Sequence, residues 1–308
     1  MSFDTVPPPA HSSISVEAAR ALVESQAPEY AHLPLGQHYE GWDCAMYRLG
    51  GVLAVRLPRT ADAVRFLLAE TRWVPELSAG WSFPFPHFPF VGVPGAGFPF
   101  PWAIVSWLPG DMAVDVPLLA SEGPTLGLAL AEVHQVAPLE APINVEQSIP
   151  MTARSEKVLR RVAVLGERGG PNGERLDTDA ALALWATASG IPDPDRSEFV
   201  WSHADLHGAN VLSMDGRFAG IVDWGSMAAC DPAVDVGFAY SLMPGEGVAS
   251  LMAAYGEATG RVDDAFVARA RGIGLAKAVG IAMNAKPETL AMGWRALDAL
   301  GLCLPART

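Results

Sequence analysis

Three polar residues in the second half of the chain have the types and spacing that phosphoryl transfer requires. Asp205 and Asn210 lie in the segment HADLHGAN, and Asp223 follows an apolar pair further along. A carboxylate that can orient a hydroxyl, an amide ligand and a second carboxylate, in this order, are the parts needed to move a phosphoryl group from a magnesium nucleotide. The segment therefore predicts a site for magnesium-dependent phosphoryl transfer.

The sequence between Asn210 and Asp223 predicts a tight β-hairpin. Residues 211–214 and 217–222 are typical of strands, and the Asp-Gly pair between them favours a two-residue turn because both positions tolerate positive φ. In that register Asp223 is the diagonal neighbour of Asn210 on one face, with Cα atoms roughly 7–8 Å apart. Magnesium takes few protein ligands and keeps water and phosphate oxygens, so one amide and one carboxylate suit it. The alternative is a polar hairpin whose Asp and Asn only cap turns.

The residues around this hairpin have structural interpretations as well as functional ones. Asp205 lies in the loop before the hairpin, where it can face an incoming hydroxyl, and His203 and His207 are expected to brace that loop. Asp231 can cap a helix that begins at the following proline, since proline is favoured at the first helical position. Asp235 can hold the loop from below. A direct contact of Asp231 with substrate is the less favoured alternative.

The stretch 201–240 resembles the aminoglycoside and macrolide phosphotransferases, which are bacterial antibiotic kinases with a protein-kinase-like fold. The resemblance continues upstream and covers most of the chain in order. It includes a first hairpin at 41–51, a third strand at 53–59, a glutamate-bearing helix at 69–75, a lobe connector WAIVSWLPG at 102–110 and a helix motif at 131–134. The resemblance implies an α+β, two-lobed fold, with a β-rich nucleotide-binding lobe in residues 1–106 and a mostly helical catalytic lobe in residues 107–308, with a cleft at their junction.

The resemblance also implies a role for each residue that occupies a family position. Asp205 would be the catalytic base, and Asn210 and Asp223 would be the magnesium ligands. Arg56 stands where the family usually has a phosphate-binding lysine, with Glu70 on the next helix as its partner. Arginine offers a permanent charge and a bidentate fork, but its reach and shape differ from those of lysine. The implied cofactors are ATP or GTP and Mg²⁺.

Further features concern the nucleotide. Backbone groups near Ser106 and Leu108, at the lobe connector, would hydrogen-bond a purine. The sequence has no G-x-G-x-x-G, so the hairpin turn of residues 36–43 would have to cover the phosphates. The alternative for Arg56 is an exposed arginine at a strand edge, with Arg59 as the phosphate ligand.

Composition fits a globular chain. At 308 residues, of which 50% are hydrophobic, it can bury a substantial core as one domain or two lobes. Its three cysteines form no C-x-x-C, which argues against a zinc site or a disulfide framework and fits a reducing cytoplasm. The N-terminus lacks a basic region followed by an apolar run, so we expect no signal peptide and a cytoplasmic location. The prolines of the uncharged segment 88–110 exclude a membrane-spanning helix there.

The formal net charge of −13 indicates which classes of binding partner the protein favours. It disfavours nucleic-acid backbones and anionic membrane surfaces, and it favours encounter with a cationic small molecule. An acidic surface also serves solubility alone. We therefore expect a small-molecule substrate, no nucleic acid and no membrane, in a monomer or homodimer.

Three hypotheses about activity remain open. The first is transfer of the γ-phosphate to a hydroxyl of an aminoglycoside-like antibiotic. The second is the same reaction on a macrolide, a peptide antibiotic or a small metabolite such as an amino alcohol or a sugar. The third is a catalytically silent nucleotide-binding protein, which the arginine at position 56 and the missing glycine loop suggest and which the complete set of Asp205, Asn210 and Asp223 argues against.

Periodicity predicts the elements that must position these residues. Thr60 can cap a helix that carries Glu70, with Leu67 and Leu68 on its apolar face. His134 lies on an apolar helix and is expected to be a satisfied core histidine. The predicted helices are 15–26, 60–75, 125–136, 155–165, 179–189, 248–259, 263–284 and 288–302, and further strands are predicted within 37–57 and at 102–107 and 198–201.

Overall fold

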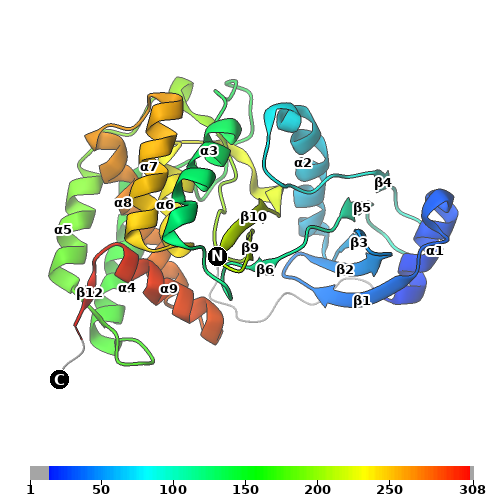
Figure 1. The fold of residues 1–308 in the computed structure, drawn as a ribbon, viewed down its shortest axis with the longest axis horizontal. Coiled ribbons are helices and arrows are strands. Elements are labelled where there is room, and N and C mark those ends of the chain that lie inside the picture. The colour runs from blue at the N-terminus through cyan, green and yellow to red at the C-terminus, as the bar shows by residue number, and fades with distance from the viewer. Residues whose placement is uncertain (1–13, 306–308) are drawn as a thin grey trace. The chain divides into compact units, whose positions relative to one another are not determined.

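The computed structural model describes residues 14–305, and the chain divides into two compact units (Figure 1). The first unit contains the chain up to Ala79, Pro84–Pro109 and Ile221–Ser226, and the second contains Gly80–Phe83, Gly110–Gly220 and the chain from Met227. Residues 1–13, which open the segment used for the signal-peptide prediction, lie outside the described range.

The first unit is built on an antiparallel sheet, in which the described strands have the order β1-β2-β3-β5-β4 (Figure 1). The strands are β1 (Leu35–Glu40), β2 (Cys44–Leu49), β3 (Leu53–Pro58), β4 (Phe90–Gly92) and β5 (Trp102–Ser106). Helix α1 (Val16–Gln26) begins at its predicted cap Ser15 and packs with Val55 and Leu57 of β3 in one core cluster. Because side chains alternate along a strand, Arg56 lies on the opposite face of the sheet.

Helix α2 (Ala61–Leu77) also begins as predicted, because the Thr60 hydroxyl accepts a hydrogen bond from the Ala63 amide at 3.2 Å. Its buried residues are Ala63, Leu67, Glu70 and Val74. The prediction that Leu68 faces the core is wrong, since this residue is 47% exposed. At 3.6 residues per turn, neighbours on a helix point about 100° apart, so Glu70 shares a face with Leu67 and Leu68 does not.

The second unit is mainly helical, as the resemblance predicts (Figure 1). Its helices are α3 (Gly123–Val133), α4 (Ser155–Arg168), α5 (Thr178–Ser189), α6 (Ala233–Phe238), α7 (Gly245–Thr259), α8 (Asp264–Ile281) and α9 (Pro287–Ala299). Helix α8 contacts α4, α5, α6 and α9, which makes it the central helix of the unit. No helix among residues 14–305 has the length and apolar character needed to cross a membrane.

Short strands pair in three small sheets within the described residues, with the orders β10-β9-β6, β11-β8 and β12-β7. They are β6 (Asp111–Met112), β7 (Arg175–Leu176), β8 (Val200–Ser202), β9 (Val211–Met214), β10 (Arg217–Ile221), β11 (Ala228–Cys230) and β12 (Cys303–Leu304). The predicted two-residue hairpin turn is confirmed, because Asp215 and Gly216 join β9 to β10 with φ values of 53° and 80°. The pairing of β7 with β12 was not predicted, since two-residue strands leave no periodic signal.

Candidate active site

Asp205 lies in the loop between β8 and β9. The buried carboxylate of Asp235 holds the backbone of this loop in place. Asp235 on α6 accepts hydrogen bonds from the amides of His203 at 2.7 Å and Ala204 at 2.9 Å. Ala204 has a φ of 64°, in the left-handed region that costs an L-residue about 1–2 kcal/mol. The two bonds hold this backbone in place, so the predicted support of the loop by Asp235 is confirmed.

His134 completes the support of Asp235. Its Nε2 lies 3.2 Å from Asp235 Oδ2, and its Nδ1 lies 2.9 Å from the Tyr255 hydroxyl. All three side chains are buried. A carboxylate only accepts, so Nε2 carries the hydrogen and Nδ1 accepts from the hydroxyl. His134 is therefore a satisfied core histidine, as predicted.

Replacing Asp235 with alanine is expected to destabilise the protein by roughly 3–5 kcal/mol, because two amides and His134 lose their buried acceptor. Chemical denaturation followed by circular dichroism measures this change. Asp179→Ala, at an exposed position on α5, is the matched control and should stay within about 0.5 kcal/mol of the parent. Equal, small effects of the two substitutions would contradict the supporting role of Asp235.

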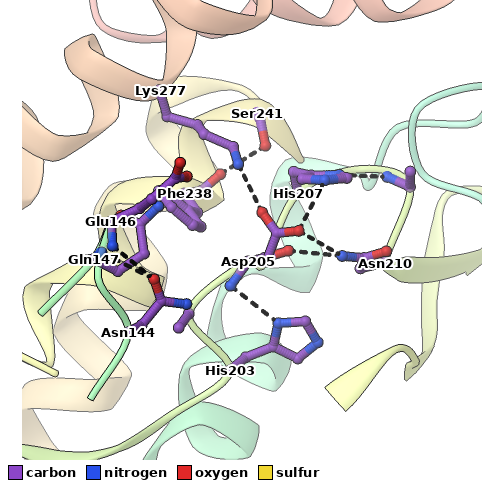
Figure 2. Close-up of polar contacts among 12 residues, drawn as sticks. Asn144, Glu146, Gln147, His203, Asp205, His207, Asn210, Phe238, Ser241 and Lys277 are labelled. Carbon is purple, nitrogen blue, oxygen red and sulfur yellow. Dashed lines mark hydrogen bonds and ion pairs between the residues drawn. The ribbon is translucent and has the colours of Figure 1, made fainter. Parts of the chain in front are cut away.

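The Asp205 carboxylate is held from several sides (Figure 2). Lys277 Nζ lies 2.8 Å from Oδ1, and His207 Nε2 lies 3.4 Å from Oδ2. Asn210 Nδ2 donates to the Asp205 backbone carbonyl at 2.9 Å and reaches Oδ2 at 3.4 Å. Burial would raise the pKa of Asp205, but Lys277 and His207 outweigh this effect and hold the pKa well below its usual range. The carboxylate is thus ionised at any working pH, and with its side chain 25% exposed it can accept a hydrogen bond from a hydroxyl.

The two histidines of the HADLHGAN segment brace the loop through defined ring nitrogens. His207 Nδ1 accepts a hydrogen bond from the Ala209 amide at 3.1 Å. The ring hydrogen is therefore on Nε2, the nitrogen that faces Asp205. His203 Nδ1 accepts from the Asp205 amide at 3.3 Å. The predicted bracing role is confirmed for both residues.

The Asn210 side chain has an orientation that suits an ion. Because its Nδ2 faces Asp205, Oδ1 is the amide atom that can bind a cation. Amide and carboxylate oxygens are ligands that magnesium accepts. Within residues 14–305 no group of three or more His, Cys, Asp or Glu could hold a metal. An amide oxygen of this kind would suit an ion that takes most of its other ligands from nucleotide phosphates and water.

Arg56, Glu70 and Asp223 form an ion-pair network in the first unit. Arg56 on β3 pairs with Glu70 on α2 through Nη1 and with Asp223 Oδ1 through Nη2 at 2.7 Å. Glu70 and Arg56 are buried, whereas the Asp223 side chain is 49% exposed. The predicted partner of Arg56 is present, and the alternative of an exposed edge arginine is wrong.

The charges of this network follow from burial and pairing. Burial raises the pKa of Glu70 to about 7, although Arg56 and the Trp224 amide lower it. Burial would lower the pKa of Arg56, but Glu70 opposes this effect and the pKa lies well above its usual range. Arg56 therefore keeps its positive charge at any pH at which the protein is folded.

The backbone after β10 is locked against α2. The Trp224 amide donates to Glu70 Oε1 at 3.2 Å. A Cβ on Gly225 would lie 2.7 Å from Phe66 Cβ, so only glycine permits this close approach. Asp223 has a φ of 62°, a conformation in which Asp and Asn are enriched among residues with side chains. These contacts fix the position of the Asp223 carboxylate within the first unit.

Arg59 differs from Arg56 in what it contacts. Its guanidinium pairs with Glu40 at 2.6 Å and donates to the Trp42 carbonyl at 3.1 Å. Both acceptors lie at the turn between β1 and β2, the segment predicted to cover the phosphates. Arg59 thus braces that turn.

The lobe connector after β5 has some of its backbone groups engaged. The Ser106 amide donates to the His87 carbonyl at 2.9 Å, and the Trp107 amide donates to the Val52 carbonyl at 2.8 Å. The Ser106 amide is therefore engaged within the unit, and a purine contact through its carbonyl stays a prediction. The contact at Leu108 stays a prediction.

Asp231 is engaged within the second unit. Its Oδ1 accepts from the Ala233 amide at 2.9 Å, and its Oδ2 pairs with Arg269 of α8 at 2.7 Å. Asp231 therefore binds the first amide of α6, but the helix begins at Ala233 and its cap residue is Pro232, one position later than the prediction that Asp231 caps a helix starting at Pro232. With both oxygens engaged and the side chain buried, a substrate contact of Asp231 finds no support in this geometry.

Comparison with known proteins bears on the arrangement as a whole. The model of the phosphotransferase enzyme family matches residues 36–271. The chain belongs to this family of phosphotransferases. A search of curated proteins gives no match. The matched segment of this phosphotransferase contains Arg56, Glu70, Asp205, Asn210 and Asp223.

Solved structures of antibiotic phosphotransferases share the fold. The GDP complex of aminoglycoside 2'-phosphotransferase-IIIa is 16% identical to this phosphotransferase, with a TM-score of 0.60 over 91% of this chain and 96% of that one. Macrolide 2'-phosphotransferase MphH from Brachybacterium faecium is 21% identical, with a TM-score of 0.57 over 90% and 98%. The streptomycin–ATP complex of APH(2")-IIa is 11% identical, with a TM-score of 0.55 over 92% and 95%. At these identities the likeness shows the fold alone, and it confirms the predicted kinase-like fold.

Lys277 is a residue of this site that sequence reasoning missed. It is 72 positions from Asp205, and no motif links the two. The available signal is a lone charge in the apolar run GIGLAKAVGI of α8. Only the packing of α8 in the folded unit shows that this charge reaches the loop between β8 and β9 that carries Asp205.

Proposed function

We propose that this phosphotransferase moves the γ-phosphate of ATP or GTP to a hydroxyl of a small molecule. The observation that carries the proposal is the Asp205 carboxylate, ionised and partly exposed on a loop that Asp235 holds from below. The oriented amide of Asn210 beside it supports the same reaction. Membership of the phosphotransferase family supports a kinase-type enzyme.

In this proposal Asp205 orients the acceptor hydroxyl. Its carboxylate accepts the hydroxyl hydrogen and turns the oxygen towards the phosphoryl group. As the O–P bond to the acceptor forms, the bond from the γ-phosphorus to the β,γ-bridging oxygen breaks and the nucleoside diphosphate leaves. Because its pKa is low, the carboxylate takes the proton late, after the forming O–P bond has made the hydroxyl more acidic. A bound magnesium ion would neutralise charge on the phosphates, with Asn210 and Asp223 as its proposed protein ligands.

Arg56 is the proposed phosphate ligand, with Glu70 and Asp223 holding its guanidinium. Arg56→Met should lower kcat/KM for the nucleotide by roughly tenfold or more beyond the effect of Arg59→Met, because charge-assisted contacts are worth about 1.5–3 kcal/mol. Steady-state kinetics with the nucleotide varied measures both effects. Arg56→Lys keeps the charge and should retain more activity than Arg56→Met. Equal effects of the two methionine substitutions would mean that Arg59 shares the phosphate-binding role.

For the acceptor we propose an aminoglycoside-like antibiotic, which the net charge of −13 supports through attraction of a polycation. Its apparent affinity should then fall as salt rises, because exposed charge pairs are screened over about 10 Å at 0.1 M ionic strength. Acceptor KM measured across a salt series tests this. A KM that does not depend on salt, or turnover only with uncharged acceptors, would favour a macrolide or a small metabolite, the alternative that the likeness to a macrolide kinase supports.

A nucleotide-consumption screen across antibiotic classes tests the proposed function. ATP and GTP are offered separately, each with aminoglycosides, macrolides, peptide antibiotics, amino alcohols and sugars. We expect acceptor-dependent consumption of at least one nucleotide. Consumption at the same rate with and without every acceptor would count against the proposal.

A further inference from the structure

The two carboxylate oxygens of Asp205 have different partners, and Lys277 is the partner of one of them (Figure 2). Nζ lies 2.8 Å from Oδ1, whereas His207 and Asn210 both face Oδ2, each at 3.4 Å. The loop itself therefore holds Oδ2 at long range, and helix α8 holds Oδ1 at short range. At 3.4 Å a hydrogen bond is weak, so the lysine supplies the firmest contact to the carboxylate.

The Lys277 side chain is largely buried and contacts an aromatic ring as well as Asp205. Its side chain is 20% exposed, and Nζ lies 4.4 Å from the centre of the Phe238 ring on α6. A cation over an aromatic face is stabilised by the ring quadrupole. The other two lysines of the chain, Lys157 and Lys286, are exposed. The chain thus buries most of the side chain of one of its three lysines, which is unfavourable unless partners such as Asp205 and Phe238 offset it.

Close helix packing brings Lys277 to the catalytic loop. A Cβ on Gly274, three residues before Lys277, would lie 2.7 Å from the Tyr240 ring and 3.0 Å from the Gly237 carbonyl. A Cβ on Gly272 would lie 2.4 Å from Ala188 Cβ on α5. Glycine at these positions lets α8 approach its neighbours more closely than any other residue would allow. Helix α8 is therefore fixed near Lys277 by contacts that Asp205 does not provide.

From these contacts we propose that Lys277 is a positioning residue for Asp205. Its ammonium group holds the carboxylate in one rotamer, so that an acceptor hydroxyl finds the oxygens in a fixed direction. The inference rests on the proposed function, in which Asp205 orients that hydroxyl. Without Lys277 the carboxylate would keep only its contacts at 3.4 Å and would sample other rotamers.

Substitution of Lys277 tests the role through kcat. Lys277→Met keeps most of the side-chain volume but removes the charge, and kcat should fall by up to about 10²-fold, the effect of a catalytic group misplaced by about 1 Å. KM for the nucleotide should stay within twofold. Lys157→Met removes the same charge from an exposed site on α4 and should leave both constants unchanged. An unchanged or increased kcat in Lys277→Met would overturn the proposal, and an increase would identify the pair as an inhibitory contact.

Chemical rescue separates positioning from general packing. Lys277→Ala should lose activity and regain part of it with added propylamine, whose ammonium can occupy the vacated position beside Asp205. Lys277→Arg should retain more activity than Lys277→Met because it keeps a charge with a different shape. Absence of rescue by both the amine and arginine would overturn the positioning role in favour of a packing role.

A readout without activity completes the test. The denaturation midpoints of the wild type, Lys277→Met, Asp205→Asn and the double variant form a double-mutant cycle. If the ion pair exists in solution, the midpoint shift of the double variant should differ from the sum of the two single shifts. Additive shifts would overturn the proposal whatever the activity. Absence of transfer by the wild type would remove the proposed function and the positioning role together. Equal transfer by wild type and Lys277→Met would remove the positioning role alone.

Discussion

Replacing Asp205 with asparagine is expected to lower turnover by roughly 10²–10⁴-fold, the usual contribution of a positioned acid or base. Asparagine keeps the shape of the side chain but cannot take the hydroxyl proton and has no charge to pair with Lys277. Steady-state kinetics with a responsive acceptor measures the loss. Nucleotide binding should change little, since the proposal places Asp205 against the acceptor and not against the nucleotide.

Asp215→Asn is the matched control for Asp205→Asn. Asp215 is exposed in the β9–β10 turn with a φ of 53°, and asparagine tolerates this backbone conformation. The control should therefore keep both stability and activity. Near-normal turnover in Asp205→Asn, with the fold intact by circular dichroism, would remove Asp205 from the mechanism.

Replacing Asp223 with alanine should abolish magnesium-dependent turnover, because it removes the proposed carboxylate ligand of the ion. Binding of the nucleotide without magnesium should persist to a large extent, since the purine contacts lie elsewhere in the proposal. Isothermal titration calorimetry with and without magnesium separates the two effects. Unchanged magnesium–nucleotide binding together with unchanged activity would refute the ligand assignment.

Asp223→Asn is the control that separates the loss of the carboxylate from backbone strain at this position. With a φ of 62° at this position, alanine costs about 1–2 kcal/mol of strain, whereas asparagine adopts the conformation more readily. Both variants also lose the charge that faces Arg56 at 2.7 Å. If both variants lose magnesium-dependent turnover, the loss therefore comes from the missing carboxylate rather than from backbone strain.

Local chemistry made the hairpin and the helix caps predictable from the sequence. The turn at Asp215 and Gly216 needs positive φ at both positions, and these two residue types supply it. Thr60 and Ser15 accept hydrogen bonds from the first turns of their helices, as their positions before amphipathic segments predict. Each of these features depends on residues within a few positions of one another.

Contacts between residues that are far apart in the sequence could not be predicted from the sequence alone. Arg56 and Asp223 are 167 positions apart, and Lys277 and Asp205 are 72 apart. No periodicity or spacing connects such pairs, because only the folded packing brings them together. The family resemblance supplied the pairing of Arg56 with Glu70, since both occupy family positions. It supplied nothing for Lys277, which lies outside every quoted motif.

The buried face of α2 shows that a count of apolar residues does not identify every core position. Hydrophobicity favoured Leu68 as a core residue, yet Leu68 is 47% exposed, and the buried face of α2 that carries Leu67 also carries Glu70. A glutamate is buried there because Arg56 and the Trp224 amide satisfy its carboxylate. The sequence alone does not show those partners, so a pattern of apolar residues places the wrong side chain inside.

Detection of the phosphorylated acceptor tests the central claim most directly. Wild-type protein, magnesium and ATP or GTP are incubated with each acceptor that stimulates nucleotide consumption, and the products are resolved by ³¹P NMR and mass spectrometry. The account predicts a new phosphomonoester on an acceptor hydroxyl, formed by the wild type and the Asp215→Asn control and lost in Asp205→Asn. Release of inorganic phosphate alone, or the same phosphomonoester formed equally fast by Asp205→Asn, would contradict it.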